Sequence, residues 1–441
     1  MKKYILILFA ALTALCSCAD KQSSSDLEQS LRADSSSSSA AAASTTTSAA
    51  ATTAAAKPTA AATTIPAPKP KPPADLVLKC KPTAEVYSEL TLADFITEKN
   101  VELRSPDAKL PTSKLGSCEI NVSYIYKQNV FSKKLTYTVT DTQPPVIILN
   151  GSGASIPVGS KFNINDLVSY GDNCDKNPVL TVTGKVDTSK AGKYTIKACV
   201  TDSSGNKTEW EPVISVVEKL PSYPDTTPII AYSDFIKRDY GKNVRCGIDV
   251  SSWQGNIDFK KVKAAGCTFV MIRIGYCSEN IVMDEHFKAN LKNASDAGLD
   301  VGIYIYTADR SPAKAREHAK WVLEQLGGAK LAMPVAFDWE EVSGFQDYDM
   351  SLHDLNETYA AFADEIRKGG YTPILYSSPF MLNSMWDEKT KAAGPVWLAH
   401  YVDKTDYKGD FAIWQVRGYG RLDGISGNVD LDIHYTDKAF I

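Results

Sequence analysis

The sequence predicts a multidomain protein whose last part, residues 245–441, folds as a TIM-like (β/α) barrel with eight strands and reduced late helices. From residue 245 onward, apolar β-branched runs alternate with helical patterns. Between residues 75 and 219, apolar and polar residues alternate with period two between turn signals, which indicates two small all-β sandwich modules. Residues 20–74 are mostly Ser, Ala, Thr, Pro and Lys, a composition that does not form a packed core. The full length of 441 residues is too large for one ordinary domain with a single hydrophobic core.

The barrel is predicted from eight apolar runs at 246–250, 269–275, 301–306, 334–339, 372–377, 396–401, 411–416 and 429–434. Helical patterns follow the first four of these runs, at 257–266, 284–298, 312–326 and 353–369. Glycines 266, 298, 327 and 370 stand where helix C-caps are expected. After the fifth run the connections shorten. We therefore expect a closed parallel barrel that has lost its late helices.

The two β modules are predicted at residues 75–143 and 144–219, followed by a connector at 220–244. In the second module, Tyr194, Ile196, Ala198 and Val200 alternate with polar residues or cysteine, as in a half-buried strand. The stretch from DTQPPVIILNG to VTDSSGNKTEWEPVISV resembles bacterial immunoglobulin-like (Ig-like) surface repeats. The first module resembles them only in its closing half, LTYTVTDTQPP.

The N-terminus predicts export. Two lysines and a short apolar stretch form a signal peptide at residues 1–19, too short for a comfortable membrane span. Its end, Leu15-Cys16-Ser17-Cys18, resembles a lipoprotein box with Cys18 as the lipidated residue, and the alternative is cleavage after Ala19. Residues 20–74 cannot bury enough apolar surface to fold, so we expect a disordered linker that tethers the protein at the cell surface.

Composition and cysteines limit the other possibilities. With a net charge of −4, the protein has no overall positive charge to attract nucleic acid, so we do not expect nucleic-acid binding. No cysteine lies at metal-ligand spacing from a histidine, so we expect no metal and no cofactor, and the Asp/Asn-rich loops are interpreted as turns in preference to calcium sites. In an oxidising compartment, the candidate disulfides join Cys80 to Cys118 and Cys174 to Cys199. Cys277 is expected near the surface, at the barrel mouth.

Four carboxylates mark the ends of the barrel runs: Asp249, Asp338, Glu340 and Asp430. Side chains at i and i+2 of a strand point the same way, so Asp338 and Glu340 should enter one mouth about 6–7 Å apart. Like charges this close raise one pKa, which suits a proton donor and an opposing carboxylate in glycosidic cleavage. Asp432 lies on the same side of this strand as Asp430, so the fourth acid could also be Asp432, although Asp430 is favoured.

The motifs DVSSWQG, VMIRIGY, AGLDVGIYIYTA, PVAFDWE, GYTPILYSS, PVWLAHY, FAIWQV and GISGNVDLD follow in this order. Together they resemble glycoside hydrolase family 25, the Chalaropsis-type lysozymes, over about residues 245–441. The resemblance implies hydrolysis of the β-1,4 bond after N-acetylmuramic acid, with Glu340 as acid/base and Asp338 stabilising the attacking acetamido group. It implies that Asp249 and Asp430 shape the subsite, and that a saccharide groove is lined by Tyr306, Tyr376, Trp397, Tyr401 and Gln415.

The sequence thus leads us to expect a monomeric peptidoglycan hydrolase whose partners are glycan strands, with the membrane reached only through the lipid anchor. Two alternatives stay open: a non-catalytic wall-binding surface protein, and a phage-type endolysin. The lipoprotein-like box and the N-terminal position of the β modules disfavour the endolysin. The spacing of about 6–7 Å lies between the retaining and inverting ranges, while the resemblance implies a substrate-assisted retaining route.

Overall fold

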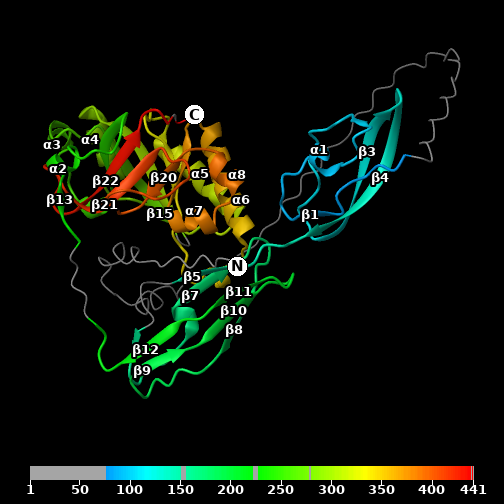
Figure 1. Ribbon diagram of the computed structural model, residues 1–441. Helices are drawn as coiled ribbons and strands as arrows, with labels where there is room; N and C mark the ends of the chain where they lie inside the picture. The colour runs from blue at the N-terminus through cyan, green and yellow to red at the C-terminus, as the bar shows by residue number, and fades with distance from the viewer. Residues whose placement is uncertain (1–75, 150–154, 222–226, 278–279, 439, 441) are drawn as a thin grey trace, which may run out of the picture.

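The computed structural model describes residues 76–149, 155–221, 227–277, 280–438 and 440, which form a barrel and two β modules (Figure 1). The predicted signal peptide, Cys18 and the linker at 20–74 lie outside the described residues. Within the described residues, no helix is both long and apolar enough to cross a membrane.

Eight strands close the barrel, as the sequence predicts. Neighbouring strands pair in the order β14-β15-β17-β18-β19-β20-β21-β22, and β22 returns to β14. The strands are β14 (Val244–Val250), β15 (Phe269–Cys277), β17 (Asp300–Thr307), β18 (Val335–Asp338), β19 (Pro373–Ser377), β20 (Val396–Ala399), β21 (Ile413–Arg421) and β22 (Val429–Tyr435). Two short strands, β13 (Ile230–Ala231) and β16 (Ile281–Met283), extend β21 and β15.

The prediction of an all-parallel barrel is wrong for the last strand, because β22 pairs antiparallel with both β14 and β21. A hairpin joins β21 directly to β22, and a hairpin reverses the chain without a crossover helix. The hydrophobic alternation of a strand is the same in both directions, so the sequence pattern carried no signal of this reversal. The reversal brings the beginning of β22, with Asp430, beside Asp249 near the end of β14.

The helices also follow the predicted pattern. They are α3 (Phe259–Ala264), α4 (Phe287–Asp296), α5 (Pro312–Leu326) and α6 (Leu352–Lys368). Ser351 caps α6 in a reciprocal capping box with Asp354, and Gly327 ends α5 in the left-handed conformation that glycine adopts without strain. Only two short helices follow β19, α7 (Pro379–Ser384) and α8 (Glu388–Ala392), and the described residues between β20 and β22 form no helix.

The second module is a sandwich of two three-stranded sheets, β6-β12-β9 and β11-β10-β8. Its strands are β6 (Ser155–Pro157), β8 (Val179–Thr183), β9 (Gly192–Thr195), β10 (Lys197–Thr201), β11 (Lys207–Trp210) and β12 (Val213–Val217). Ala198 and Val200 of β10 are buried while Lys197 and Cys199 are partly exposed, which confirms the predicted alternation. A single 3-10 turn, η2 (Ile164–Asp166), precedes β7.

A pair of strands in the second module, β5 (Val146–Leu149) and β7 (Val168–Gly171), docks on the barrel. The contact is made with the loop after β18, including the 3-10 turn η4 (Phe345–Asp347). Ser169 Oγ accepts from Gly344 N at 2.8 Å, and Gly171 lies so close to the Phe345 ring that a Cβ there would be 2.6 Å from it. This loop follows the Asp338-Trp339-Glu340 triplet, so the second module supports the segment that carries two of the predicted catalytic acids.

The first module differs from the predicted sandwich, because residues 76–143 form one four-stranded sheet in the order β1-β4-β3-β2. Its elements are β1 (Thr83–Glu85), α1 (Leu92–Phe95), β2 (Glu102–Leu103), β3 (Gly116–Tyr126) and β4 (Asn129–Thr140). Helix α1 and irregular segments, rather than a second sheet, cover the apolar face, with Phe95 packed edge-on against Tyr137. The Tyr87 ring stacks on His353 of α6 at 3.5 Å, beside a hollow of about 420 Å³.

The two predicted disulfides are not formed, since every cysteine of the described residues is a free thiol. Cys118 pairs with Tyr137 across β3 and β4, whereas Cys80 forms an isolated bridge with Ile96. Cys174 packs against the core of the first module, and the Cys199 thiol lies 3.8 Å from the Thr201 hydroxyl on its own strand. Side-chain phase identified the exposed face of β10, but it could not identify a partner.

Candidate active site

The four predicted acids meet at one end of the barrel. Asp249 on β14 lies opposite Asp430 on β22, and Asp338 is the last residue of β18. Glu340 lies two residues beyond that strand, and its carboxyl group is in hydrogen-bond contact with that of Asp338. Asp249 and Asp338 are each 6% exposed, whereas Glu340 and Asp430 are half-buried. The two more accessible acids therefore face the solvent side of the cluster.

A hydrogen-bond chain fixes the floor of this cluster. Tyr376 and Tyr401 both donate to Gln415 Oε1, at 2.9 and 2.8 Å. Gln415 Nε2 in turn donates to Asp249 Oδ2 at 2.8 Å. Because the two hydroxyl groups occupy the amide oxygen, the Gln415 side chain presents its nitrogen to Asp249. The chain therefore holds the Asp249 carboxyl in one orientation.

Burial raises the pKa of every acid in the cluster. The pKa of Asp249 rises to about 6 through burial, opposed by its hydrogen bonds from Gln415 and Asp432. Burial, followed by the charge of Glu340, raises the pKa of Asp338 well above its ordinary value. Burial also raises the pKa of Glu340 to about 7, with the charge of Glu341 adding to the shift. Near neutral pH the site can therefore hold a protonated carboxyl beside an ionised one, as acid catalysis requires.

Asp430 and Asp432, which the sequence could not separate, both belong to the cluster. Asp430 lies at the mouth, where burial and the Asp249 charge raise its pKa well above the ordinary value. Asp432 is fully buried, and its Oδ1 accepts from Trp397 Nε1 at 2.9 Å. Burial, then the charge of Asp249, raises the pKa of Asp432 well above the ordinary value as well. The geometry gives Asp430 access to the mouth and Asp432 a place beneath it.

The buried Asp432 carboxyl predicts a pH-dependent change in stability. A carboxyl whose folded pKa is raised stabilises the fold below its unfolded pKa, and this contribution is lost as pH rises through the folded pKa. We expect Asp432→Asn, which retains an acceptor for Trp397, to gain about 2 kcal/mol relative to the wild type between pH 5 and pH 8. Denaturant unfolding at both pH values measures this, with the exposed acid variant Asp423→Asn as control. An equal difference at both pH values would contradict the prediction.

Several residues that the sequence analysis did not select also shape the mouth. Arg273 of β15 pairs with the buried Asp284 and donates to Ser252 Oγ at 2.9 Å. Asp284 Oδ2 also accepts from Ser252 N, so these contacts fix the loop that follows β14. Tyr304 is half-buried near Asp249 and Asp338, whose charges add to the effect of burial in raising its pKa. Arg273 had a usable signal, since it is the one charge within the apolar run FVMIRIGY.

Comparison with known proteins identifies the barrel. Residues 248–425 match the family model described as Glycosyl hydrolases family 25. The barrel is a glycosyl hydrolase family 25 domain. Residues 147–216 match the model described as a bacterial surface protein Ig-like domain, which covers the second module but not the first. The two family matches agree with the two resemblances predicted from the sequence.

Two curated relatives have sequence similarity to the family 25 domain. The autolytic lysozyme of Clostridium acetobutylicum is 29% identical over 188 residues, covering 42% of this chain and 54% of that protein. Lysozyme M1 of Streptomyces globisporus is 29% identical over 199 residues, covering 42% of this chain and 65% of that protein. The matched region thus spans about half to two-thirds of these relatives.

Solved structures include similar chains. A family 25 glycosyl hydrolase from Bacillus anthracis is 21% identical and covers 43% of this chain and 88% of its own, with a TM-score of 0.39. A bacterial lysozyme from Streptomyces coelicolor is 24% identical and covers 44% of this chain and 98% of its own, with a TM-score of 0.38.

The predicted groove residues of the family 25 domain divide into buried and accessible groups. Trp397 is only 1% exposed, so it cannot stack on a sugar and instead holds Asp432. Tyr376 and Gln415 are also buried, within the hydrogen-bond chain to Asp249. Tyr306 and Tyr401 are half-buried, and the Tyr306 hydroxyl donates to Glu341 at 2.9 Å. The prediction of a groove wall is therefore wrong for Trp397, because its indole points into the barrel core.

Two aromatic side chains close to the mouth are more accessible. Trp253 follows β14 in the 3-10 turn η3 (Ser252–Gln254) and is 67% exposed. Tyr276 near the end of β15 is also exposed, and its ring lies 5.7 Å from the Arg273 guanidinium. Trp253 belongs to the DVSSWQG motif, but the motif does not reveal whether its side chain is accessible, so it could not be selected from the sequence.

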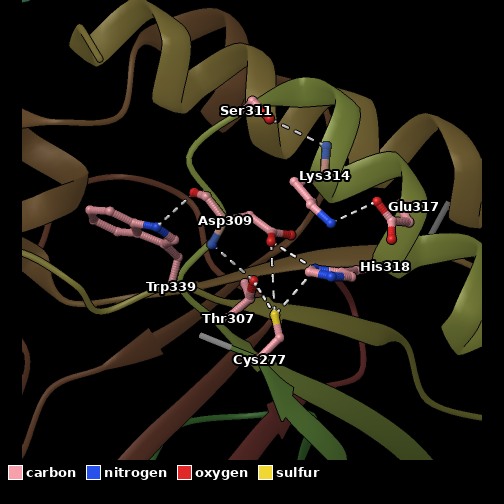
Figure 2. Close-up of polar contacts among 8 residues, drawn as sticks. All are labelled: Cys277, Thr307, Asp309, Ser311, Lys314, Glu317, His318 and Trp339. Carbon is pink, nitrogen blue, oxygen red and sulfur yellow. Dashed lines mark hydrogen bonds and ion pairs between the residues drawn. The ribbon is translucent and has the colours of Figure 1, made fainter. Parts of the chain in front are cut away.

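Cys277 is buried, contrary to the prediction that it lies near the surface. It is 2% exposed, and its thiol lies 2.9 Å from Thr307 Oγ1 and 3.2 Å from His318 Nδ1 (Figure 2). His318 Nδ1 also pairs with Asp309 Oδ1 at 2.7 Å. The backbone carbonyl of Asp309 accepts from the Trp339 indole at 3.2 Å. The cluster of Cys277, Asp309 and His318 therefore supports the residue that lies between Asp338 and Glu340.

The His318 ion pair predicts a loss of stability in alkaline solution. Burial alone would lower the pKa of His318, but hydrogen bonds with Asp309 and Cys277 outweigh it and raise the pKa to about 10. Since the folded pKa is the raised one, this stabilisation is complete below about pH 6.5 and is lost as pH rises through about 10. We expect His318→Asn to lose about 3–5 kcal/mol of unfolding free energy at pH 7 and distinctly less at pH 10.5.

Denaturant unfolding at both pH values tests this expectation. The matched control is Lys314→Gln on the same helix, because Lys314 pairs with the exposed Glu317 and such surface pairs contribute at most about 1 kcal/mol. A His318→Asn loss that stays constant between pH 7 and pH 10.5 would mean that the imidazole stabilises the fold without its charge.

Proposed function

We propose that the protein is a peptidoglycan hydrolase, an N-acetylmuramidase that cleaves the β-1,4 bond between N-acetylmuramic acid and N-acetylglucosamine. The observation that carries this proposal is the Asp338–Glu340 pair. Glu340 is the more accessible of the two and its pKa is raised to about 7, mainly by burial. Burial raises the pKa of both acids, so the pair can share one proton near neutrality, and in the proposed reactive form Glu340 carries it and donates it to the glycosidic oxygen while Asp338 is ionised.

Asp338 has the complementary role in this proposal. Its Oδ1 is buried and has no hydrogen-bond partner among the described residues. A carboxylate oxygen in that state can accept the N–H of a substrate amide group, which would orient the 2-acetamido group as it attacks its own anomeric carbon. Asp249 and Asp430 then shape the subsite around the sugar, with Gln415 holding Asp249.

The contact between the two carboxyl groups supports a substrate-assisted, retaining route. Two carboxyls that flank an anomeric carbon stand about 5 Å apart in ordinary retaining enzymes and about 6.5–9.5 Å apart in inverting ones. Asp338 and Glu340 instead lie in contact with one another, so neither of these spacings applies, and we assign the role of nucleophile to the substrate. The acetamido oxygen of the substrate is then the available nucleophile. Glycans without a 2-acetamido group should not be cleaved.

We propose that the enzyme acts outside the cell, where its substrate lies. The match of residues 147–216 to a surface-protein Ig-like model supports this location. The lipoprotein-like box predicts an anchor at Cys18, and the linker predicts a flexible tether. The anchored domain would then reach wall glycan near its own membrane, where its task would be wall remodelling or lysis of competitors. Mass spectrometry of the mature N-terminus tests the anchor, since a diacylglyceryl mass on Cys18 supports it and an unmodified N-terminus after Ala19 contradicts it.

A turbidity assay on purified cell walls tests the proposed activity. The enzyme should clear a suspension of peptidoglycan and should leave a suspension of cellulose, which lacks acetamido groups, unchanged. Sedimentation of the protein with the walls without any fall in turbidity would contradict hydrolysis and indicate the wall-binding alternative.

A further inference from the structure

The loops that join the two modules and the barrel bring several acidic side chains together. Asp141 lies between β4 and β5, at the junction of the two modules, and Asp172 directly follows β7. Asp202 precedes the turn between β10 and β11. All three are buried, and Asp172 is 0% exposed. Within the described ranges, no lysine or arginine forms an ion pair with any of them; the neighbouring Lys176 pairs with Asp354 instead.

Three oxygen atoms in this cluster are buried without any hydrogen-bond partner: Asp141 Oδ2, Asp172 Oδ1 and Asn173 Oδ1. The other oxygen of each aspartate is occupied, since Asp141 Oδ1 accepts from Asn173 Nδ2 at 3.2 Å and Asp172 Oδ2 accepts from Cys174 N at 2.9 Å. Burying an ionised carboxylate without a partner is costly, so such groups in proteins are paired or bind a metal. The unpartnered oxygens therefore indicate a cation.

The spacing of the two carboxylates fits one ion. Ligand atoms of Asp141, Asp172 and Cys174 all lie within 4.8 Å of one another. Oxygen ligands of Ca²⁺ lie about 2.3–2.6 Å from the ion, so two of them on opposite sides are about 4.8 Å apart. Asn173 and backbone carbonyls of the same loops can add neutral oxygens. Carboxylate and amide oxygens are hard ligands, which suit Ca²⁺ better than a soft metal.

We propose that Asp141, Asp172 and Asn173 form a calcium site at the junction of the two modules and the barrel. Asn206 supports it, because its Nδ2 donates to the Asp141 carbonyl at 3.1 Å and to Asp202 Oδ2 at 2.9 Å. The Asp172 carbonyl accepts from Leu352 N at 2.8 Å, and the Asn173 carbonyl accepts from His353 N at 3.2 Å. An ion bound here stiffens the loop on which α6 of the barrel begins. This proposal adds a ligand to loops whose sequence was interpreted as turns.

Isothermal titration of the full chain with CaCl₂, after treatment with chelator, tests the site. We expect one Ca²⁺ per chain with a Kd of about 10⁻⁴–10⁻³ M, the range of extracellular calcium modules. Saturating Ca²⁺ should raise the Tm by at least about 3 °C relative to chelator. Mg²⁺ should bind more weakly, because it demands near-ideal octahedral geometry.

Variants separate this site from adventitious binding to surface acids. Asp141→Asn and Asp172→Asn should each weaken Ca²⁺ binding by at least about tenfold, and both should unfold at or above the wild-type temperature in chelator, because each removes an unpaired buried charge. Asp166→Asn, an exposed acid of the same module, is the matched control and should bind as the wild type does. The proposal would be overturned by an absence of Ca²⁺ binding, by binding of Ca²⁺ to Asp141→Asn and Asp172→Asn as tightly as to the wild type, or by binding of Zn²⁺ but not Ca²⁺.

Discussion

Glu340→Gln is expected to lower kcat on cell-wall glycan by about 10³-fold, the loss typical when a general acid is removed. Glutamine keeps the size of the side chain and can still contact Asp338, but it has no proton to donate to the leaving oxygen. KM should change little, because substrate contacts elsewhere in the mouth are preserved. Release of reducing sugar ends at saturating substrate measures the effect.

The control for this variant is Glu341→Gln, the adjacent carboxyl, which accepts the Tyr306 hydroxyl and lies outside the Asp338 contact. Its kcat should fall by less than about tenfold, and both variants should retain the wild-type circular dichroism spectrum. Wild-type kcat should also fall as pH rises above about 7, because burial sets the pKa of Glu340 near that value and the donor then loses its proton. Comparable activity of Glu340→Gln and Glu341→Gln would remove Glu340 from the mechanism.

Asp338→Asn is expected to lower kcat by about 10²–10³-fold, a loss typical of a removed electrostatic contact to the transition state. The acetamido group becomes more positive as its oxygen attacks, and only a carboxylate can balance that charge. Asparagine keeps the size and one oxygen but has no charge. A second effect follows at Glu340, because the neighbouring carboxyl that influences its pKa is lost.

Steady-state kinetics and a pH profile together test the role of Asp338. The alkaline limb of kcat should shift in Asp338→Asn, whereas Asp347→Asn in the exposed part of the same loop should leave both kcat and the limb as in the wild type. A lowered kcat with an unmoved alkaline limb would indicate that Asp338 acts through structure rather than through charge.

The sequence allowed the barrel to be predicted strand by strand, because each buried strand is a short β-branched run bounded by turn or helix signals. The direction of β22 could not be predicted, since side-chain alternation is the same for parallel and antiparallel strands. The first module was predicted as a sandwich from the strands β3 and β4, but the pattern of a long hairpin does not reveal whether a sheet or a helix covers it. Here α1 covers it, with Phe95 fully buried.

The meeting of the four acids at one end of the barrel could be predicted from the sequence, but the contacts that support them could not. Asp338 and Glu340 could be selected from the sequence because they are two residues apart at the end of an apolar run. Asp284 and Asp432 act through contacts that form only in the folded barrel, with Arg273 and Trp397 respectively. Trp397 was predicted to face the sugar because aromatic residues at strand ends can do so, and the fold buries it instead. Cys277 was likewise placed by its position near a strand end, whereas its burial depends on α5, which supplies His318.

The contact between the second module and the barrel gives the N-terminal half of the chain a structural role. The loop after Glu340 is held by Ser169 and by the strand pair β5–β7. A change at this junction can therefore displace the segment that carries Glu340, because the Gly344 amide bound by Ser169 lies in the loop that directly follows that residue. The proposed calcium site lies at the same junction, since it shares Asp172 with the contact to α6.

The sugar found at the new reducing ends shows whether the barrel cleaves after N-acetylmuramic acid with Glu340 as proton donor. Digested peptidoglycan is treated with borohydride, hydrolysed, and analysed for sugar alcohols by mass spectrometry. We predict muramitol in digests by the wild type and its absence in digests by Glu340→Gln. Glucosaminitol in place of muramitol would contradict cleavage after N-acetylmuramic acid, and equal muramitol from both proteins would contradict the role of Glu340.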